Sequence, residues 1–329
     1  MKKRGKEGTS QKTFGLALGG GSARGLSHIG VLKVLHQHKL FPNYLAGTSM
    51  GAVIAALYAA GYTPEQIQEL AKTTDWHNIV DFTVPKAGLI RGQLVENKLR
   101  QLLQNKTFAE LAIPLQLVAY NLTKRQQVVF SQGDVAKAVR ASISIPGIFT
   151  PLRIGNDSYV DGSISNPTPF DVVQKRGADV VVAIDLFKGE KPSREQKAQR
   201  GGLFSELKKE FILAEFLNVE NYLFPKRWPH FFRRIGTWGF EKLLSPARFL
   251  KRLAGKELPD IAKVMNLSIG CLMNNLAKER LQHADIALKI TPSFGKLHWS
   301  DFDKVDAFVA IGEEAMRKEM KRLRELLWG

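Results

Sequence analysis

The stretch GLALGGGSARG at residues 15–25 joins a short apolar run to three consecutive glycines. Residues 13–18 predict a buried strand, and the apolar spacing over residues 25–38 predicts a helix. A glycine loop between a strand and a helix lets backbone N–H groups converge on a negative charge, near the positive end of the helix. The stretch therefore predicts an anion-binding loop at the first strand-to-helix turn of an α/β fold.

Two kinds of anion-binding site use such a loop. A dinucleotide site requires glycine at the third motif position, which is Ser22 when counting starts at Gly20. It also requires an acidic residue about 20 residues further on, near the end of the second strand. There this chain has Gly47-Thr48-Ser49, with no carboxylate nearby. We therefore favour the other kind of site, an oxyanion hole for acyl transfer.

Residues 47–51 form the pattern G-x-S-x-G, with Ser49 at its centre. Glycines two positions before and after a serine permit the sharp strand-to-helix turn that raises its hydroxyl above the sheet edge. By itself the pattern is also compatible with a tight turn and a capping serine. The strand before it, the alanine-rich helix after it and the glycine loop one βα unit upstream favour a nucleophile elbow.

Strands and helices alternate along most of the chain. Besides the segments above, the hydrophobic patterns predict strands at residues 44–46, 115–120, 128–130, 180–185 and 286–290. They predict helices at residues 50–60, 93–104, 134–141, 169–176 and 304–327. Thr63, Pro64 and Gln66 predict the start of a further helix. Such alternation indicates an α/β fold with a mostly parallel sheet covered by helices on both faces.

The composition is that of a globular protein. Lys and Arg outnumber Asp and Glu by 48 to 31, for a net charge of +17, and 44% of the residues are apolar. The single cysteine, Cys271, excludes an intrachain disulfide framework and a thiolate zinc cluster, and we expect it to be a small buried residue. We expect no secretory signal, and no membrane span at residues 40–64, where Pro, Gly and polar residues interrupt the uncharged stretch.

A serine nucleophile needs a base. A triad of the α/β-hydrolase kind would need a late histidine such as His283 or His298, but several strands precede the nucleophile in that fold and only one βα unit does here. The alternative base is a carboxylate at the end of a later strand. Asp161 follows Tyr159 and Val160, and Gly162 after it permits a tight turn.

The motifs of this chain, in this order, resemble those of the bacterial patatin-like phospholipases. The matching stretches are residues 18–25 with 27–32, residues 47–51, Ala-Ser-Ile-Ser-Ile-Pro-Gly-Ile-Phe at 141–149, and Asp-Gly-Ser at 161–163. The resemblance extends over residues 13–186 and resumes weakly over residues 286–316. It implies a three-layer α/β/α fold and hydrolysis of carboxylic esters by a Ser–Asp dyad, with Ser49 as nucleophile and Asp161 as base.

The resemblance also implies the surroundings of the dyad. It assigns Gly47 and Gly51 to the elbow and, to the oxyanion hole, Gly20, Gly21, Ser22, Arg24 and Gly25. Two residues depart from the family pattern. The family usually has glycine at the position of Ser22, and glycine or alanine at the position of Ser163. Ser22 alters the backbone of the loop if that position needs a positive φ.

The domain organisation is predicted to be a basic flexible tail at residues 1–12 and a single catalytic domain at residues 13–329. An insertion at about 187–260 interrupts the sheet pattern, and residues 191–256 within it hold 15 Lys and Arg against six Asp and Glu. Basic residues mixed with Trp and Phe suit an anionic membrane interface. The residues predicted to bind it are Arg227, Trp228, Arg233, Arg234, Trp238, Arg248 and Arg252. An insertion with its own small core is the main alternative, and nucleic-acid binding is the least favoured.

These observations leave three classes of function. The first is a lipid acyl hydrolase working at a membrane surface, the second a soluble carboxylesterase or acyltransferase with the same dyad, and the third a non-catalytic scaffold of the same fold. We favour the first, with a lipid or acyl-ester substrate. We expect a cytoplasmic protein in peripheral contact with the inner face of the membrane, and neither a metal nor another cofactor, because the histidines and acidic residues lack ligand spacing.

Overall fold

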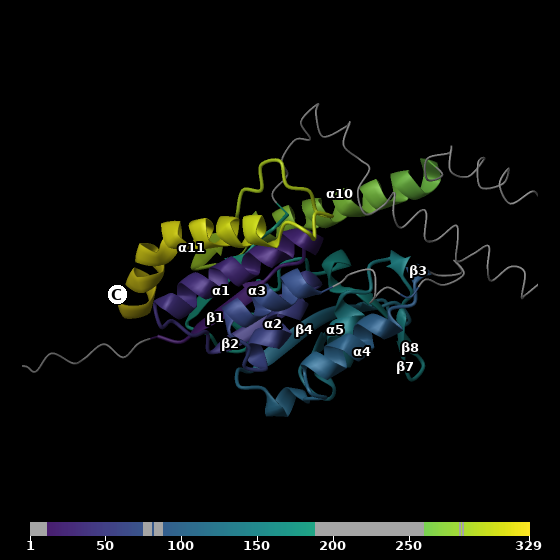
Figure 1. Cartoon of the computed structure of the whole chain (residues 1–329), viewed down its shortest axis with the longest axis horizontal. Coiled ribbons are helices and arrows are strands. Elements are labelled where there is room, and N and C mark those ends of the chain that lie inside the picture. Colours follow the sequence, from purple (N-terminus) through teal and green to yellow (C-terminus); the bar gives the residue numbers. More distant parts are fainter. Residues whose placement is uncertain (1–11, 75–80, 82–87, 188–259, 283, 285) are drawn as a thin grey trace, which may run out of the picture.

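The computed structural model describes residues 12–74, 81, 88–187, 260–282, 284 and 286–329 (Figure 1). Nearly all of the predicted basic tail and insertion lies outside these ranges, as do all seven residues predicted to bind a membrane. At the end of the predicted tail, the Lys12 backbone N–H donates to Leu327 O at 3.1 Å, so the first described residue is joined to the C-terminal helix.

One eight-stranded sheet forms the centre of the molecule, in the order β10-β9-β1-β2-β4-β8-β7, with β5 also paired to β4. Its strands are β1 (Phe14–Leu18), β2 (Tyr44–Thr48), β4 (Leu115–Asn121), β5 (Gln126–Phe130), β7 (Leu152–Ile154), β8 (Asp157–Asp161), β9 (Val180–Ile184) and β10 (Leu288–Ile290). A separate two-stranded sheet pairs β3 (Gly88–Ile90) with β6 (Gly147–Phe149).

The sheet is mostly parallel, as the sequence predicts, with an antiparallel part at one side. Strands β10, β9, β1, β2 and β4 run parallel to one another. Strands β8 and β5 run antiparallel to β4, and β7 runs antiparallel to β8. Only two residues separate β7 from β8, and Gly155 between them has φ +59°. Such a short connection can join only antiparallel strands, but strands of three to five residues give a weak pattern in the sequence.

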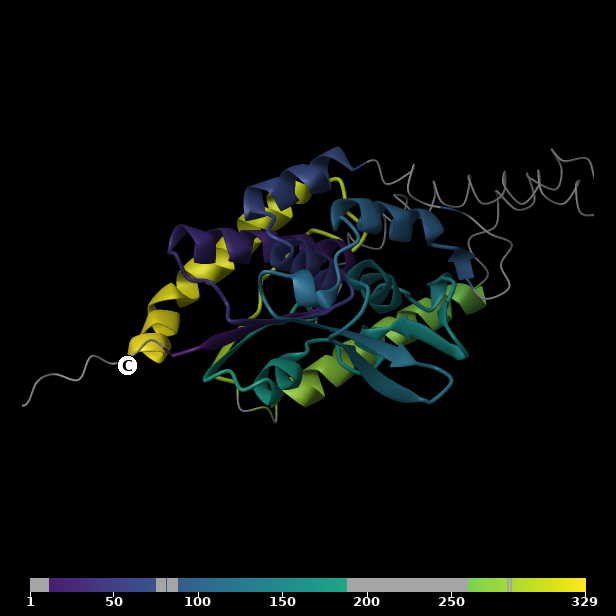
Figure 2. The same ribbon diagram turned by 90° about the horizontal axis from the view of Figure 1, so that it is seen from below.

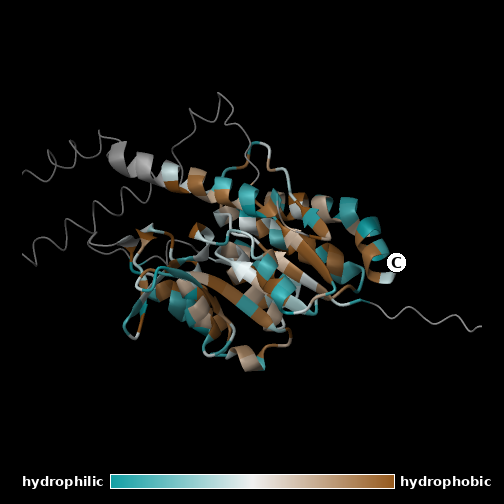
Figure 3. Ribbon diagram, turned by 180° about the vertical axis from the view of Figure 1, so that it is seen from behind, coloured by the Kyte–Doolittle hydropathy of each residue, from teal (hydrophilic) through white to brown (hydrophobic). Residues whose placement is uncertain are grey.

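Helices cover both faces of the sheet, which confirms the three layers (Figure 2). The larger layer contains α1 (Ser27–Gln37), α2 (Met50–Ala59), α3 (Pro64–Thr73), α4 (Gln93–Leu102), α5 (Val135–Ser142) and α11 (Val305–Trp328). The opposite layer contains α6 (Phe170–Lys175) and α10 (Asp260–Gln282). Alternate side chains of β1 point to opposite faces of the sheet. Leu16 and Leu18 belong to the larger hydrophobic core, and Ala17 belongs to the smaller one. Figure 3 colours these central strands largely brown and the outer helices in a mixture of teal and brown.

Helices α1 and α11 cross at very short range, with one glycine of each at the contact. A Cβ on Gly30 would lie 2.0 Å from Val309 O, and a Cβ on Gly312 would lie 1.9 Å from Ser27 O. No larger residue fits at either position without separating the helices. The C-terminal helix thus packs directly against the helix that follows the glycine loop (Figure 1).

Several local predictions are confirmed by the structure. Thr63 caps α3 in a reciprocal capping box with Gln66, and Pro64 is the first helical residue. Residues 40–64 form β2 and α2, and no helix in the described part of the chain is long and apolar enough to cross a membrane. The prediction for Cys271 is wrong, because it is exposed. It lies in a part of α10 that precedes the buried residues Ala277 and Leu281.

Candidate active site

The register of β4 brings Ser49 and Asp161 to the same level of the sheet. On one side of β4, Thr48 at the end of β2 is aligned with Val118. On the other side, Asp161 at the end of β8 is aligned with Ala119. Since β8 runs antiparallel to β4, its last residue arrives beside the carboxyl end of β2, where Ser49 begins the next turn.

Ser49 occupies a strained elbow between β2 and α2. Its backbone has φ 56° and ψ −125°, a conformation that non-glycine residues rarely adopt. The turn closes because Gly47 and Gly51 lack side chains: a Cβ would lie 2.6 Å from Ala52 Cα at the first position and 2.2 Å from Leu18 O at the second. Only 5% of Ser49 is exposed.

Asp161 has a buried carboxyl group, and only one of its two oxygens accepts a hydrogen bond among the described residues. Its Oδ1 accepts from the Ser163 backbone N–H at 2.8 Å, whereas Oδ2 is buried and has no hydrogen-bond partner among the described residues. Burial raises the pKa of the carboxyl to about 6, and interactions with the side chain of Ser49 and with Ser163 partly oppose this rise. The Ser49 side chain therefore lies near Asp161, although the contact falls short of a hydrogen bond, as is common before substrate binds.

The glycine loop lies against this pair. A Cβ on Gly20 would lie 2.5 Å from Ser163 Oγ and 3.2 Å from Ser49 Cβ, so glycine is needed there for close approach. The loop continues into the short 3-10 helix η1 (Ser22–Leu26), where a Cβ on Gly25 would lie 2.3 Å from Met50 Cγ at the start of α2. The structure thus brings together the loop, the elbow and Asp161.

Some backbone N–H groups of the loop already donate to carbonyls within the protein. Fewer of the predicted residues can therefore act as donors in an oxyanion hole. The Gly20 N–H donates to Pro167 O at 2.9 Å, and the Arg24 N–H donates to Gly21 O at 3.1 Å within the turn. Gly25 lies inside η1, where it serves packing. In the part of the chain that the structure describes, no acceptor is recorded for the N–H groups of Gly21 and Ser22, so these two are the candidate donors.

Ser22 has φ 53°, so this loop position does adopt the left-handed conformation that favours glycine. The substitution that distinguishes this chain from the family pattern therefore falls where a side chain is strained. Nonetheless the Ser22 N–H keeps its place at the start of η1.

His28 in α1 fixes the beginning of the loop. Its ring is buried, and Nε2 lies 2.7 Å from Gly19 O, a geometry in which Nε2–H donates to the carbonyl. Burial lowers the pKa of His28 to about 4, so the ring is neutral near pH 7. The peptide unit between Gly19 and Gly20 is thus held at both ends, by His28 and by Pro167.

The Arg24 side chain contacts two segments that lie next to the glycine loop. Its guanidinium donates through Nη1 to Leu186 O at 3.4 Å, and its Cζ lies 5.1 Å from the centre of the Phe294 ring. The neighbouring Ala23 N–H donates to Trp299 O at 2.9 Å. The segment after β10 therefore packs on the glycine loop, which the sequence did not reveal.

The structure describes one of the two late histidines that a triad would need. His283 belongs to the residues that the structure does not describe. His298 lies in the segment after β10, and its Nδ1 is 2.8 Å from Ser300 Oγ. Over the described ranges, no three His, Cys, Asp or Glu side chains gather as a metal site.

Sequence reasoning missed the contribution of Ser142. Its Oγ accepts from the Ser49 backbone N–H at 2.9 Å and donates to Val118 O at 2.6 Å. The motif at 141–149 was the available signal, since a serine that ends an apolar helix face and is wholly buried needs hydrogen-bond partners.

Comparison with known proteins agrees with these motifs. Residues 16–173 match the family described as patatin-like phospholipase. An uncharacterized NTE family protein of Mycobacterium tuberculosis is 34% identical over 182 residues, which are 54% of this chain and 50% of that protein. Patatin-like phospholipase domain-containing protein 6 of Homo sapiens is 35% identical over 182 residues, which are 53% of this chain and 13% of that protein.

A lysophospholipase, NTE1 of Debaryomyces hansenii, is 28% identical over 183 residues, which are 54% of this chain and 12% of that protein. The chain thus spans half the length, or less, of these curated relatives. Among solved structures, VipD from Legionella pneumophila superposes with a TM-score of 0.52 at 14% identity, covering 96% of this chain and 67% of that one. This similarity shows a shared fold.

Proposed function

Residues 16–173 of this chain form a patatin-like phospholipase domain, and on this premise we propose that the protein is a lipid acyl hydrolase with Ser49 as its nucleophile. Its substrates are carboxylic esters of lipids or phospholipids. One observation carries the proposal above the others: the register of β4 places a strained serine beside a buried carboxyl group whose pKa is about 6.

The first half of the reaction transfers the acyl group to the enzyme. Asp161 accepts the hydroxyl proton through Oδ2 while Ser49 Oγ attacks the ester carbonyl, and the negative oxygen is stabilised by the N–H groups of Gly21 and Ser22. When the tetrahedral intermediate collapses, the C–O bond to the leaving alcohol breaks and Asp161 returns the proton to that alcohol. Loss of one such donor typically raises the barrier by about 2.7 to 4 kcal/mol.

The second half uses water in the same way. Asp161 takes a proton from water, the hydroxide oxygen attacks the acyl carbon, and the Ser49 oxygen leaves and recovers that proton. The carboxylic acid then departs and the enzyme returns to its starting state. An alcohol in place of water would make the enzyme an acyltransferase, which is the second candidate function.

The deciding experiment combines covalent labelling with turnover. We expect a fluorophosphonate probe to label the wild type at Ser49, and Ser49→Ala and Asp161→Asn each to lose hydrolysis of a short soluble ester. Asp157→Asn is the matched control, because Asp157 begins the same strand β8 but is paired with Lys124 at 2.8 Å. It should keep its activity.

Two results would contradict the proposal. An unlabelled wild type that hydrolyses no ester would favour the non-catalytic scaffold. Near-normal turnover in Asp161→Asn, with unchanged circular dichroism, would exclude Asp161 as the base, and loss of turnover on replacing His283 or His298 would then favour a triad.

We also propose that the enzyme works in peripheral contact with an anionic membrane on its cytoplasmic side. The support for this part comes from the sequence of the basic, aromatic-rich insertion and from the word lysophospholipase in the name of one relative. A soluble carboxylesterase with the same dyad is the alternative, and comparison of hydrolysis in vesicles and in solution distinguishes the two.

A further inference from the structure

The end of α5 and the residues directly after it contact the backbones of both proposed catalytic residues. Ser142 Oγ accepts from the Ser49 N–H at 2.9 Å, and two residues later Ser144 O accepts from the Asp161 N–H at 2.9 Å. Neither contact involves the reacting atoms. Both link segments that lie far apart in the chain, since Ser142 comes 93 residues after Ser49.

The Ser142 hydroxyl donates one hydrogen bond and accepts another, and its two partners fix which is which. Its proton is donated to Val118 O at 2.6 Å, so it presents a lone pair to the Ser49 N–H. Val118 O is also the atom against which the dyad turn packs, since a Cβ on Gly162 would lie 2.4 Å from it. The buried Ser142 hydroxyl therefore links the Ser49 elbow to Val118 O. The same carbonyl oxygen limits how closely the turn after Asp161 can approach β4.

The elbow needs this acceptor. Ser49 has φ 56°, and its N–H stands at the start of α2, where no helical carbonyl is available to it. A buried N–H left without an acceptor costs about 1 to 3 kcal/mol. A change in the elbow backbone would relieve that cost and would move Ser49 Oγ.

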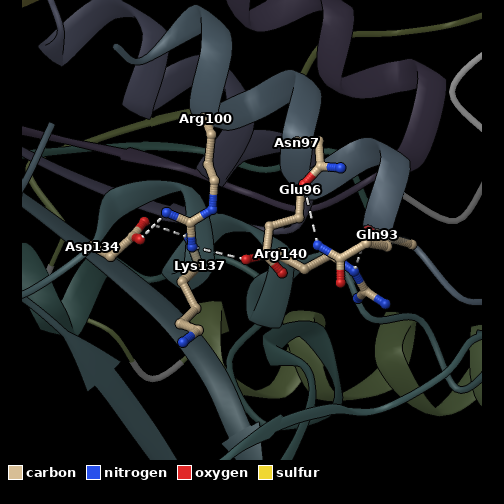
Figure 4. A network of polar contacts seen from close by, with 8 residues as sticks. Gln93, Glu96, Asn97, Arg100, Asp134, Lys137 and Arg140 are labelled. Carbon is tan, nitrogen blue, oxygen red and sulfur yellow. Dashed lines mark hydrogen bonds and ion pairs between the residues drawn. The ribbon is translucent and has the colours of Figure 1, made fainter. Parts of the chain in front are cut away.

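Helix α5 is itself held at both ends, and Figure 4 shows the network of polar contacts at its start. At its start, Arg100 of α4 pairs with Asp134, the N-cap of α5, and with Glu96 at 2.9 Å. At its end, the buried guanidinium of Arg140 donates to Ser144 Oγ at 2.5 Å.

The remaining donors of Arg140 hold neighbouring loops. They reach Gly92 O at 3.0 Å, Arg91 O at 2.6 Å and Thr150 O at 3.1 Å. The turn that carries Ser142 is therefore anchored to three carbonyls in two neighbouring segments, so it can act as a rigid support for the elbow.

From this arrangement we infer that Ser142 is a positioning residue of the ester hydrolase: its hydroxyl holds the Ser49 elbow against β4 and thereby sets the approach of Ser49 Oγ to Asp161. The inference rests on the proposed function. It assigns a role to a serine that does not touch substrate.

The test compares Ser142→Ala with Ser142→Thr, which retains the hydroxyl. We expect Ser142→Ala to lower kcat by about tenfold or more with little change in KM, because misplacement by about 1 Å can cost about 100-fold in rate. Fluorophosphonate labelling should slow in parallel. The acid limb of the pH profile should move to higher pH, because the Ser49 side chain lowers the pKa of Asp161. Ser142→Thr should restore all three quantities.

Tyr62→Phe provides the control for loss of one hydrogen bond. The Tyr62 hydroxyl donates to Leu102 O at 2.8 Å, away from the loop and the elbow, so its removal should lower stability without changing kcat or the pH profile. Rates are compared per folded molecule, with the folded fraction taken from circular dichroism.

The outcomes separate the inference from the proposed function. A wild type that is neither labelled nor active defeats the proposed function. An active wild type together with a Ser142→Ala variant of equal kcat and unchanged pH profile overturns the positioning role alone. A folded Ser142→Thr variant that remains as slow as Ser142→Ala overturns it as well.

Discussion

At the scale of single residues, Asp161 combines deep burial with the proposed role of a base. Burial raises the pKa of its carboxyl from 3.8 to about 6, so a buried carboxylate is still available near pH 7 and binds a proton more readily than an ordinary aspartate. This makes it a better proton acceptor than its residue type suggests. Two measurable consequences follow, one for activity and one for stability.

The activity of the enzyme should have an acid limb near pH 6. Below this pH Asp161 is protonated and cannot accept the proton of Ser49, so kcat/KM should fall about tenfold per pH unit. Initial rates on a short neutral ester between pH 4 and 8 measure the limb. A limb near pH 4, with the protein still folded, would show that a different group is the base.

The same raised pKa should make the wild type less stable than its Asp161→Asn variant. A raised carboxyl pKa contributes stability that is complete below pH 3.8 and lost as the pH rises through about 6. At pH 7.5 the variant should therefore gain about 1 to 3 kcal/mol in the free energy of unfolding. Urea denaturation measures it.

The control for this stability change is Asp157→Asn, which removes a carboxylate that is paired with Lys124 on the same strand. It should give no gain. An Asp161→Asn variant that is less stable than the wild type at pH 7.5 would contradict the burial of an unfavourable charge.

Ser22 tests whether the loop acts through its backbone. Since the candidate donor is the N–H, Ser22→Gly should keep kcat within about twofold and relieve the strain of φ 53°. Ser22→Val should lower both kcat and stability, because a β-branched side chain is poorly tolerated at positive φ. A loss of more than tenfold in Ser22→Gly would instead place the hydroxyl in the site.

At the scale of the elements, the crossing of α1 and α11 supports the glycine loop through Ser27. Ser27 Oγ, at the start of α1, donates to Arg24 O in η1 at 2.7 Å. The Ser27 carbonyl is the atom that Gly312 of α11 approaches most closely. We therefore expect a change in the C-terminal helix to affect the loop through Ser27.

Gly312→Ala should separate the two helices. Its Cβ would lie 1.9 Å from Ser27 O, so we expect a loss of about 1 to 3 kcal/mol in the free energy of unfolding, together with a lower kcat. Gly270→Ala in α10 is the matched control, since nothing lies within 4 Å of a Cβ there. Alanine at an open helical site should be neutral or stabilising by about 0.5 to 1 kcal/mol. Equal stability of the two variants would contradict the close crossing.

At the scale of the whole molecule, the charge is unevenly distributed along the chain. Residues 191–256 carry 15 Lys and Arg against six Asp and Glu, and they lie outside the described residues. Each Lys or Arg near an anionic surface contributes about 1 kcal/mol to binding before screening by salt. We therefore expect this segment to deliver the enzyme to anionic membranes.

Charge reversal at Arg227, Arg233, Arg234, Arg248 and Arg252 should abolish binding to anionic vesicles while hydrolysis of a short soluble ester is retained. Raising the salt concentration should weaken vesicle binding of the wild type in parallel. Co-sedimentation with anionic and neutral vesicles measures both effects. Unchanged affinity in the reversed variant would leave the segment as a structural insertion.

Much of this molecule could be predicted from its sequence, because the deciding signals are local. The capping box at Thr63, the strand-to-helix turns and the Ser49 elbow depend on neighbouring residues, whose steric and hydrogen-bonding demands can be read over a few positions. The three-layer architecture followed from the alternation of strands and helices. Ser49 was identifiable for the same reason, since glycines two residues away on either side permit its turn.

Only the tertiary structure decided which residues surround Ser49. The antiparallel direction of β8, the availability of the Gly21 and Ser22 N–H groups, and the partners of Ser142 depend on strand register and on contacts between distant segments. Hydrophobic periodicity reports which side of an element is buried, but it carries no information about which element packs there. The raised pKa of Asp161 has the same origin, because it is caused by burial under segments that fold over it.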